Sequence, residues 1–203
     1  MKSQFEIKEK SEIEDILKSV SFGTLALCKD NLPYSLPINF VKIDEYIYFH
    51  GKKSGKKMSY IKENPIASFS VVESYSIIPS YFSTKENHAC PATHFFKSVN
   101  IEGEIEIVKN YDTKVKALEH LMQKLQPQGG YLPLKEPLYK KRIDAVEIFR
   151  LKILKVTGKA KLAQHLPKER FEMILDNLEK RGESIDKKTI ENMLATREKN
   201  CEK

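Results

Sequence analysis

Apolar and polar residues alternate strictly over residues 98–108. The apolar positions fall on every second residue from Val99 to Ile107, with Gly103 among them, and the positions between carry asparagine or glutamate. Successive side chains of a β-strand point to opposite faces, so this pattern predicts a strand with one buried face and one acidic, solvated face.

Other patterns predict the remaining elements. Apolar, β-branched runs predict strands at residues 23–28, 34–43, 46–50, 66–72 and 145–156. Apolar spacings of three and four predict helices at residues 11–19, 56–64, 112–125, 167–180 and 186–199. Residues 73–94 and 127–137 show no regular pattern. Because most strands follow one another without a long helix between them, the order favours a mainly β fold with an antiparallel barrel over a parallel α/β sheet.

The character of the chain changes after Gly158. All the predicted strands lie before this residue, and two short amphipathic helices follow it. Helices of this length are marginally stable alone because helix nucleation is costly. We therefore predict a β domain over residues 1–158 and a helical extension over residues 159–203, packed on that domain or on a partner subunit.

The net charge of +7 is concentrated in the middle of the chain. Residues 109–161 contain 13 lysines and arginines against 5 acidic residues. A basic surface attracts nucleic acid or small anions. The sequence has no helix-turn-helix or zinc-finger pattern, so we expect small anions and no nucleic-acid partner.

The cellular setting is predicted from what the sequence lacks. It contains no apolar run long enough to span a membrane, and its first residues lack the apolar core of a signal peptide. Its three cysteines, at positions 28, 90 and 201, show no paired spacing. We expect a cytoplasmic protein with reduced thiols and no membrane contact.

The segment Tyr46–Lys57 carries the most specific chemical signal. A short β-type run leads into His50-Gly51 and then into a turn with four lysines and two glycines. Glycine lets the backbone approach a ligand closely, and clustered ammonium groups bind phosphate. A Walker A loop has four residues between its glycines and a Ser or Thr after its lysine. Gly51 and Gly55 enclose three residues, and Lys57 follows Lys56. The pattern predicts a phosphate site that is not of the kinase or ATPase type.

This turn and its surroundings resemble the FMN-binding split barrel of the pyridoxamine 5′-phosphate oxidase-like family. The branch that the sequence most resembles is that of the nitroimidazole-resistance-type flavoproteins. The resembling segments come in the family's order over roughly residues 10–158. They are Gly23–Ala26, Pro37–Phe40, Phe49–Pro65 and Phe96–Val99 with Gly103. The resemblance implies a six-stranded antiparallel split barrel that binds FMN as a homodimer.

The resemblance also implies cofactor-binding residues. Lys56 and Lys57 match the basic pair for the FMN phosphate, and a helix beginning there would add free N–H groups. His50 and Gly51 match the strand end beside the ribityl chain and rings, and Ser54 lines the turn. Other matched positions are the strand that binds the pyrimidine edge (Pro37, Ile38, Asn39, Phe40) and residues near the ring (Thr93, Ser98). The Cys90–Thr93 stretch would approach the flavin from the neighbouring subunit.

A metal site was considered at His88, Cys90 and His94, since histidine and cysteine are zinc ligands. The other histidines and cysteines are distant in sequence, so a structural loop is favoured and no metal is assigned. No catalytic residue is assigned either, because in a flavoenzyme the cofactor performs the redox chemistry.

The leading interpretation is an FMN-dependent oxidoreductase that reduces a small, electron-poor substrate such as a nitroaromatic compound. Its electrons would come from a nicotinamide cofactor or another reductant. Pyridoxamine 5′-phosphate oxidase activity itself is disfavoured because the family's C-terminal Arg-x-His motif is absent. A non-enzymatic flavin-binding regulator and a haem-binding split-barrel protein remain as alternatives.

Overall fold

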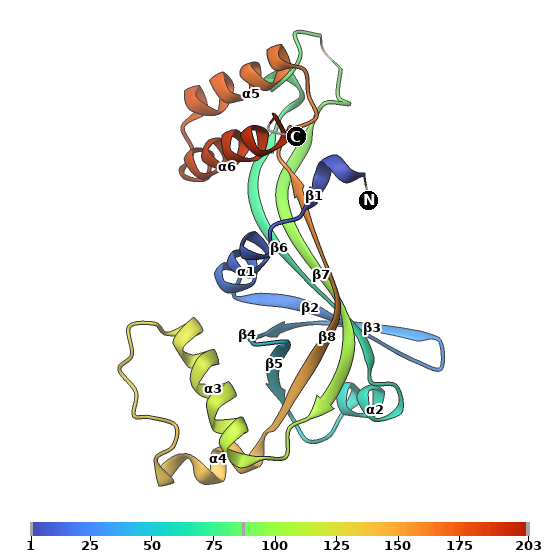
Figure 1. Ribbon diagram of the computed structural model, residues 1–203, viewed down its shortest axis with the longest axis vertical. Helices are drawn as coiled ribbons and strands as arrows, with labels where there is room; N and C mark the ends of the chain where they lie inside the picture. Colours follow the sequence, from blue (N-terminus) through green and yellow to red (C-terminus); the bar gives the residue numbers. More distant parts are fainter. Residues whose placement is uncertain (1, 87, 202–203) are drawn as a thin grey trace. The chain divides into compact units, whose positions relative to one another are not determined.

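The computed structural model of the protein describes residues 2–86 and 88–201 (Figure 1). The strands are β1 (Glu6–Ile7), β2 (Phe22–Lys29), β3 (Leu32–Asn39), β4 (Val41–Ile43), β5 (Tyr46–Gly51), β6 (Ile66–Ile78), β7 (Thr93–Ile107) and β8 (Glu147–Lys161). The α-helices are α1 (Lys10–Ser19), α2 (Lys56–Glu63), α3 (Tyr111–Leu125), α4 (Lys140–Ala145), α5 (Lys168–Arg181) and α6 (Ser184–Cys201). Short 3₁₀ turns lie at Ser3–Phe5 (η1), Ser80–Phe82 (η2) and Pro137–Tyr139 (η3).

The strands form one sheet in the order β3-β2-β6-β7-β8-β5-β4, and β1 pairs with β8 outside this path. Pairing is antiparallel between β2 and β3, β2 and β6, β4 and β5, and β5 and β8. The expected mainly β, antiparallel architecture is confirmed. The described residues form eight strands rather than the six predicted.

The chain folds into two compact units, each assembled from separate segments. Residues 13–71 and 99–157 form one, called here the strand unit. The residues before 13, residues 72–98 and the residues from 158 onward form the other, called here the helix unit. The long strands β6, β7 and β8 contribute residues to both units.

Aromatic residues fill the core of the strand unit. Phe49 and Phe149, which are register partners in β5 and β8, stack with ring centroids 5.1 Å apart. Phe40 packs edge-on against Phe69 at 4.8 Å. The helix α3 covers β4 and β5 (Figure 1), with Leu121 buried against them. This core supports the end of β5, where the basic turn begins.

The alternation predicted for residues 98–108 is present in β7, where apolar residues are buried and Glu102 and Glu104 are exposed. Gly103 lies on the buried face, directly against β8. A Cβ at this position would overlap the backbone oxygen of Lys152 and lie 2.9 Å from a methyl group of Leu151. Real Cβ atoms do not approach backbone so closely, so only glycine lets the two strands pair here.

Gly103→Ala should therefore destabilise the protein by about 1–3 kcal/mol, the usual cost of overpacking a core. Glu104→Ala, on the exposed face of the same strand, should change the free energy of unfolding by less than about 0.5 kcal/mol. Urea unfolding of both variants measures the difference. Equal stability of the two variants would show that β7 and β8 separate easily at this point.

Four strands differ from their predicted bounds. The strand predicted at 34–43 is two strands, because β3 pairs with β2 while β4 pairs with β5, and the fully buried Phe40 lies between them. The strand predicted at 66–72 continues to Ile78, and the last strand continues to Lys161. The segment after Val72 interleaves polar residues with Tyr75, Ile77 and Ile78, and burial of Tyr75, Ser76 and Ile78 stabilises it as a strand.

Residues 127–137 contain no helix or strand before η3, as expected, but the short helix α4 that follows was not predicted. The strand predicted at 98–108 begins earlier, at Thr93.

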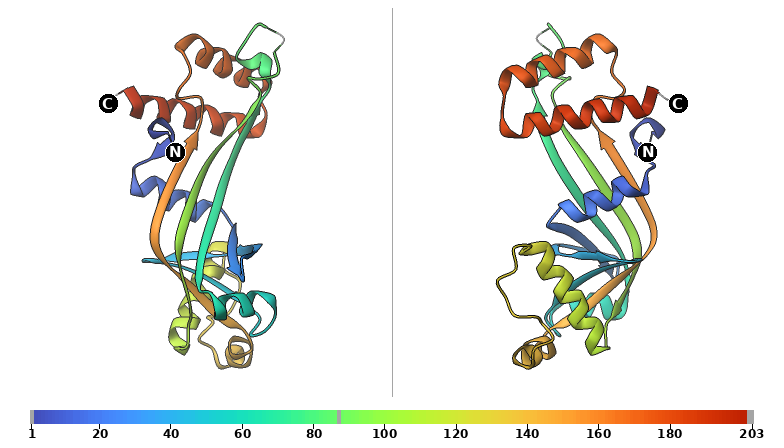
Figure 2. Two further views of the ribbon diagram at one scale, coloured as in Figure 1. Left: turned by 90° about the vertical axis from the view of Figure 1, so that its right-hand side faces the viewer. Right: turned by 60° about the vertical axis from the view of Figure 1, so that its left-hand side comes forward.

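In the helix unit, α5 and α6 lie side by side (Figure 2) and bury Phe171, Ile174, Leu178 and Met193. The two helices confirm the predicted ranges 167–180 and 186–199 to within two residues. Gly182 ends α5 in the left-handed conformation, with its N–H donating to the carbonyl of Leu178.

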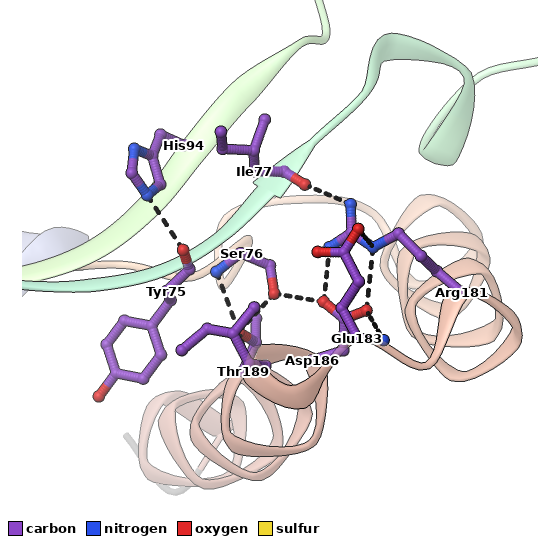
Figure 3. A network of polar contacts seen from close by, with 9 residues as sticks. Tyr75, Ser76, Ile77, His94, Arg181, Glu183, Asp186 and Thr189 are labelled. Atoms are coloured by element: carbon purple, nitrogen blue, oxygen red, sulfur yellow. Dashed lines mark hydrogen bonds and ion pairs between the residues drawn. The ribbon is translucent and has the colours of Figure 1, made fainter.

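A buried polar network joins these helices to β6 (Figure 3). The Ser76 hydroxyl donates to Asp186 Oδ1 at 2.6 Å, and the Ser76 N–H donates to the Thr189 hydroxyl at 3.0 Å. Arg181 binds both oxygens of Asp186, at 2.5 and 2.9 Å, and donates to the carbonyl of Ile77. Each polar group at this junction thus has a specific partner, which fixes the position of α6 on β6.

None of the helices in the described part of the chain is long and apolar enough to cross a membrane.

Candidate functional site

The basic turn between β5 and α2 has a backbone that only glycine favours. Gly55, which precedes α2, has φ +102° and ψ −178°, a conformation that side chains disfavour. Gly55 has no side chain to cap the helix, and the first N–H groups of an α-helix have no partner within the helix. The backbone N–H groups at the start of α2 and the helix dipole therefore favour an anion here.

Lys57 lies across the end of β5. Its ammonium nitrogen donates to the carbonyl oxygen of His50 at 3.3 Å and lies over the rings of Phe49 and Phe149, 5.4 and 5.1 Å from their centroids. A Cβ at Gly51 would overlap this nitrogen. Gly51 therefore provides the space that Lys57 occupies.

The electrostatic surroundings of Lys57 favour a bound anion. Burial lowers the pKa of Lys57 below the ordinary lysine value. Within residues 2–86 and 88–201 no carboxylate forms an ion pair with it. The ammonium of Lys57 has already lost part of its hydration on folding, so an arriving anion does not have to displace that water. A partly buried cation without a counter-charge therefore attracts an anion more strongly than a fully hydrated one does.

A hollow of about 530 Å³ adjoins this strand end. It is lined by His50, Gly51, Lys52, Lys53 and Ser54, and on the other side by Ala145 and Val146. Ser54 and both of these lysines are exposed. The nearest acidic residue in the strand register, Glu147 opposite Gly51, is already paired with Lys114 at 3.2 Å. The charge of the hollow is therefore positive.

The pKa of His50 is lowered, first by partial burial and then by the positive charge of Lys57, which favours its neutral form. A neutral imidazole can donate one hydrogen bond and accept another. His50 lines the hollow and offers it such a polar group.

Lys56 is oriented differently from Lys57. Its ammonium nitrogen lies over the rings of Tyr34 and Tyr60, 4.4 and 5.6 Å from their centroids. The two lysines of the predicted phosphate pair thus point to different partners: Lys57 to the end of β5 and Lys56 to the two tyrosine rings.

The residues predicted to bind the pyrimidine edge lie at the border of the sheet. Pro37, Ile38 and Asn39 belong to β3, which is the terminal strand of the sheet order, so a ligand could pair with its outer edge. The Asn39 side chain donates to the carbonyl of Ser21 at 3.1 Å. Phe40 is fully buried and presents no side chain to solvent.

Phe40 lies beneath Lys124, a residue that the sequence analysis did not consider. The Lys124 ammonium is 3.6 Å from the Phe40 ring centroid and donates to the carbonyl of Leu17 at 2.8 Å. Burial lowers the pKa of Lys124 to about 8. Its position three residues after Leu121 places it on the inner side of α3, and this spacing was the available signal. No pattern in the sequence indicated that Tyr34, Ala145 or Val146 would lie near the site.

The remaining predicted residues belong to the helix unit. Ser98 is buried in β7, and Thr93 accepts a hydrogen bond from Lys161 at the start of that strand. The other predicted residues, Pro37–Phe40, His50, Gly51, Ser54, Lys56 and Lys57, all belong to the strand unit. Within that unit His50, Gly51 and Ser54 share one hollow, and Lys57 contacts the first two.

The three residues considered as metal ligands have separate partners. His88 pairs with Glu86 at 3.0 Å, and His94 contacts Ser74 and the carbonyl of Tyr75. Cys90 is exposed and lines a different cavity. Among the residues that the structure describes, no three histidine, cysteine or acidic side chains are placed to share a metal ion.

Comparisons with solved structures show the same fold. The chain superposes on a candidate 5-nitroimidazole antibiotic resistance protein from Bacteroides thetaiotaomicron with a TM-score of 0.61 and 18% identity, covering 76% of this chain and 85% of that one. It superposes on the flavocytochrome Anf3 from Azotobacter vinelandii with a TM-score of 0.65 and 18% identity, covering 77% and 69%.

A FAD and haem binding protein from Mycobacterium smegmatis matches with a TM-score of 0.64 and 17% identity, covering 77% and 73% of the two chains. No curated protein sequence matches this one.

The family comparison agrees with the fold. The family model described as pyridoxamine 5′-phosphate oxidase matches residues 9–160 of the 203. The matched region ends with β8 and leaves α5 and α6 outside it. The chain therefore belongs to the pyridoxamine 5′-phosphate oxidase-like family of split-barrel proteins.

Proposed function

We propose that the protein binds FMN at the hollow beside the β5–α2 turn. The observation that carries the proposal is Lys57. It is a partly buried cation with a lowered pKa, it has no carboxylate partner in the described residues, and its ammonium lies in the space left by Gly51. The surrounding groups fit a phosphate dianion: two further lysines line the hollow, and the N–H groups of α2 begin next to it.

Bound FMN would supply the electron-transfer chemistry, and the residues of the chain would bind and orient it. Lys57 would neutralise the phosphate together with Lys56, which would have to leave the tyrosine rings. His50 would provide an uncharged hydrogen-bonding group beside it. The outer edge of β3 at Pro37–Asn39, with Phe40 directly after it, would bind the pyrimidine side through backbone groups.

We further propose an oxidoreductase that reduces a small electron-poor substrate, such as a nitroaromatic compound, with a nicotinamide cofactor or another reductant as donor. Family membership and the fold shared with a candidate nitroimidazole resistance protein support this activity. The unpaired spacing of the three cysteines supports a reducing, cytoplasmic setting.

The absorption spectrum of freshly purified protein, with mass spectrometry of the released ligand, tests the cofactor. We expect a yellow protein that releases FMN. A Soret band would favour haem, since one matched structure is described as a FAD and haem binding protein and another as a flavocytochrome. A released ligand with the mass of FAD would contradict the choice of FMN. Oxidation of NADH or NADPH on addition of a nitroaromatic compound then tests the activity.

A homodimer is part of this proposal, because Thr93 and Ser98 would complete the flavin site from the partner subunit. We expect light scattering at micromolar concentration to give twice the mass of one chain. A monomer that binds FMN with full affinity would contradict both the dimer and the proposed role of Thr93 and Ser98.

A further inference from the structure

A second cavity, in the helix unit, is separate from the residues assigned to FMN phosphate binding. It has a volume of about 350 Å³ and is lined by residues of the η2–β7 region, the end of β8 and the start of α5. The 3₁₀ turn η2 contacts α5, and in Figure 1 the two lie at the same end of the drawing. The family match ends at residue 160, so Lys161, His165 and Arg170 belong to a part of the chain that the family model does not describe.

Basic groups surround this cavity. Lys161, at the end of β8, donates to the hydroxyl of Thr93. Arg170, in the first turn of α5, donates from Nε to the carbonyl of Ser83 at 2.9 Å and from Nη2 to its hydroxyl at 3.3 Å. His165, between β8 and α5, packs its ring on Phe5, with centroids 5.1 Å apart. Three elements thus bring three nitrogen-bearing side chains to one space.

The positive charge of the cavity is not balanced by its own residues. No aspartate or glutamate is among the described residues that line it. In the described part of the chain, neither Lys161 nor Arg170 forms an ion pair with a carboxylate. The pKa of His165 is lowered, first by partial burial and then by the positive charges of Arg170 and Lys161. Clustered like charges disfavour one another, and a bound anion would relieve this repulsion.

The remaining N–H groups of Arg170 suit an anionic group that presents two oxygen atoms. The two bonds from Arg170 to Ser83 use two of its five N–H groups and hold the guanidinium in place. A positioned guanidinium can bind two oxygens of one phosphate or carboxylate, and a nearby ammonium adds charge.

The walls of the cavity suit an apolar body. The buried residues Ile78, Phe95 and Ile174 line it together with the partly buried Leu166. A volume of about 350 Å³ corresponds to the smaller of ordinary ligand sites, which range from about 300 to 1,000 Å³. A ligand with a single ring and one acidic group matches the volume, the positive charge and the apolar wall of the cavity.

We propose that this cavity is a binding site for a small organic anion, in which Arg170 and Lys161 bind a phosphate or carboxylate group and the apolar wall binds a compact, ring-sized body. The site is distinct from the hollow assigned to the FMN phosphate, and it shares with the proposed flavin site only the Cys90–Thr93 stretch. It uses residues of α5 and of the β8–α5 connection, and it does not depend on the protein being a flavoenzyme.

Isothermal titration of the full-length protein with phenyl phosphate and with benzoate tests the site and distinguishes the two anionic groups. Phenol tests the apolar wall alone, and inorganic phosphate tests the charge alone. We expect one of the two organic anions to bind at least ten-fold more tightly than phenol and inorganic phosphate. Equal binding of phenol, or equal binding of inorganic phosphate, would overturn the proposal.

Arg170→Met and Lys161→Met should each weaken binding of that anion about ten- to one-hundred-fold, the usual effect of losing a charged hydrogen bond. Lys168→Met is the matched control: Lys168 lies in the same first turn of α5, 82% of its side chain is exposed, and its ammonium lies near Glu172. If Arg170→Met fails to fold because its bond to Ser83 is lost, Lys161→Met decides. An equal loss in Lys168→Met would show only a general charge effect and would overturn the site.

Competition with FMN distinguishes this proposal from the proposed flavin site. Thr93 lines this cavity and is also proposed to face the flavin of the partner subunit, but the anionic group is bound by Arg170 and Lys161. Saturating FMN should therefore leave the affinity for the organic anion unchanged, and Arg170→Met should leave the affinity for FMN unchanged. If FMN displaces the organic anion, the cavity belongs to the flavin site and the inference is wrong. If FMN does not bind at all, the flavin proposal fails while the anion titration still decides this one.

Discussion

Replacing Lys57 with methionine should weaken FMN binding about ten- to one-hundred-fold and leave riboflavin binding nearly unchanged. Hydrogen bonds to charged groups contribute about 1.5–3 kcal/mol, and each 1.4 kcal/mol changes a dissociation constant about ten-fold. Methionine keeps an unbranched apolar side chain of similar length and removes the ammonium group, which lies over the rings of Phe49 and Phe149. Riboflavin lacks the phosphate, so the comparison isolates the charge. Fluorescence titration of both flavins into the wild type and the variant measures the effect.

Other lysines of the same segment provide the controls. Lys62 is exposed in the last turn of α2, so the Lys62→Met variant should bind FMN with the affinity of the wild type. Lys56→Met should have a smaller effect than Lys57→Met, since Lys56 must first leave the rings of Tyr34 and Tyr60. The double variant of Lys52 and Lys53 should lose affinity mainly at low salt, because exposed charges act through screened attraction. Equal losses for FMN and riboflavin in Lys57→Met would contradict a phosphate contact.

Replacing Asp186 with alanine should destabilise the protein by about 3 kcal/mol, the lower end of the cost of breaking a buried ion pair. Asp186 is 1% exposed and accepts from both Arg181 and Ser76 (Figure 3). Its removal leaves the buried Ser76 hydroxyl with one partner fewer and Arg181 without its main counter-charge. The lower end applies because the Arg181 side chain is 20% exposed and can be partly resolvated. Guanidinium chloride unfolding measures the loss, and Asp176→Ala, an exposed position in α5, serves as the control.

The contribution of Asp186 should also depend on pH. Its pKa is lowered, first by the hydrogen bond from Arg181, so the folded state binds this proton less readily than the unfolded state does. The stabilisation is therefore complete above the unfolded pKa of about 4 and is lost as the pH falls through the lower folded pKa. The stability difference between the wild type and Asp186→Ala should be constant at neutral pH and should shrink below about pH 4. A difference that stays constant through acid pH would show that the carboxylate charge is not what stabilises the network.

Local patterns in the sequence were sufficient for the elements that bury one regular face. The alternation in residues 98–108 and the apolar stripes of the helices appear in β7, α3 and α5 because each side chain's direction follows from the period of its element. In α6 the predicted stripe is only partly buried: Asp186 and Thr189 are buried together with Met193, while Leu194 is exposed. The same reasoning failed at Glu73–Ile78, a strand whose polar residue Ser76 is buried with hydrogen-bond partners on α6, more than a hundred residues away.

Some features of the candidate site also followed from the sequence, while others depended on the tertiary structure. The residue types and spacing of the turn His50–Lys57 by themselves indicated a phosphate site, because glycine conformations and clustered ammonium groups are local properties. Only the tertiary structure decided that Lys57, and not Lys56, lies against the end of β5, since this depends on Phe149 and Gly51 lying beneath its side chain. Likewise, Lys161 and Arg170 are an unremarkable pair of surface residues in the sequence. They share a cavity because β8 and α5 bring them to the start of β7, and charge acts through distance in space rather than along the chain.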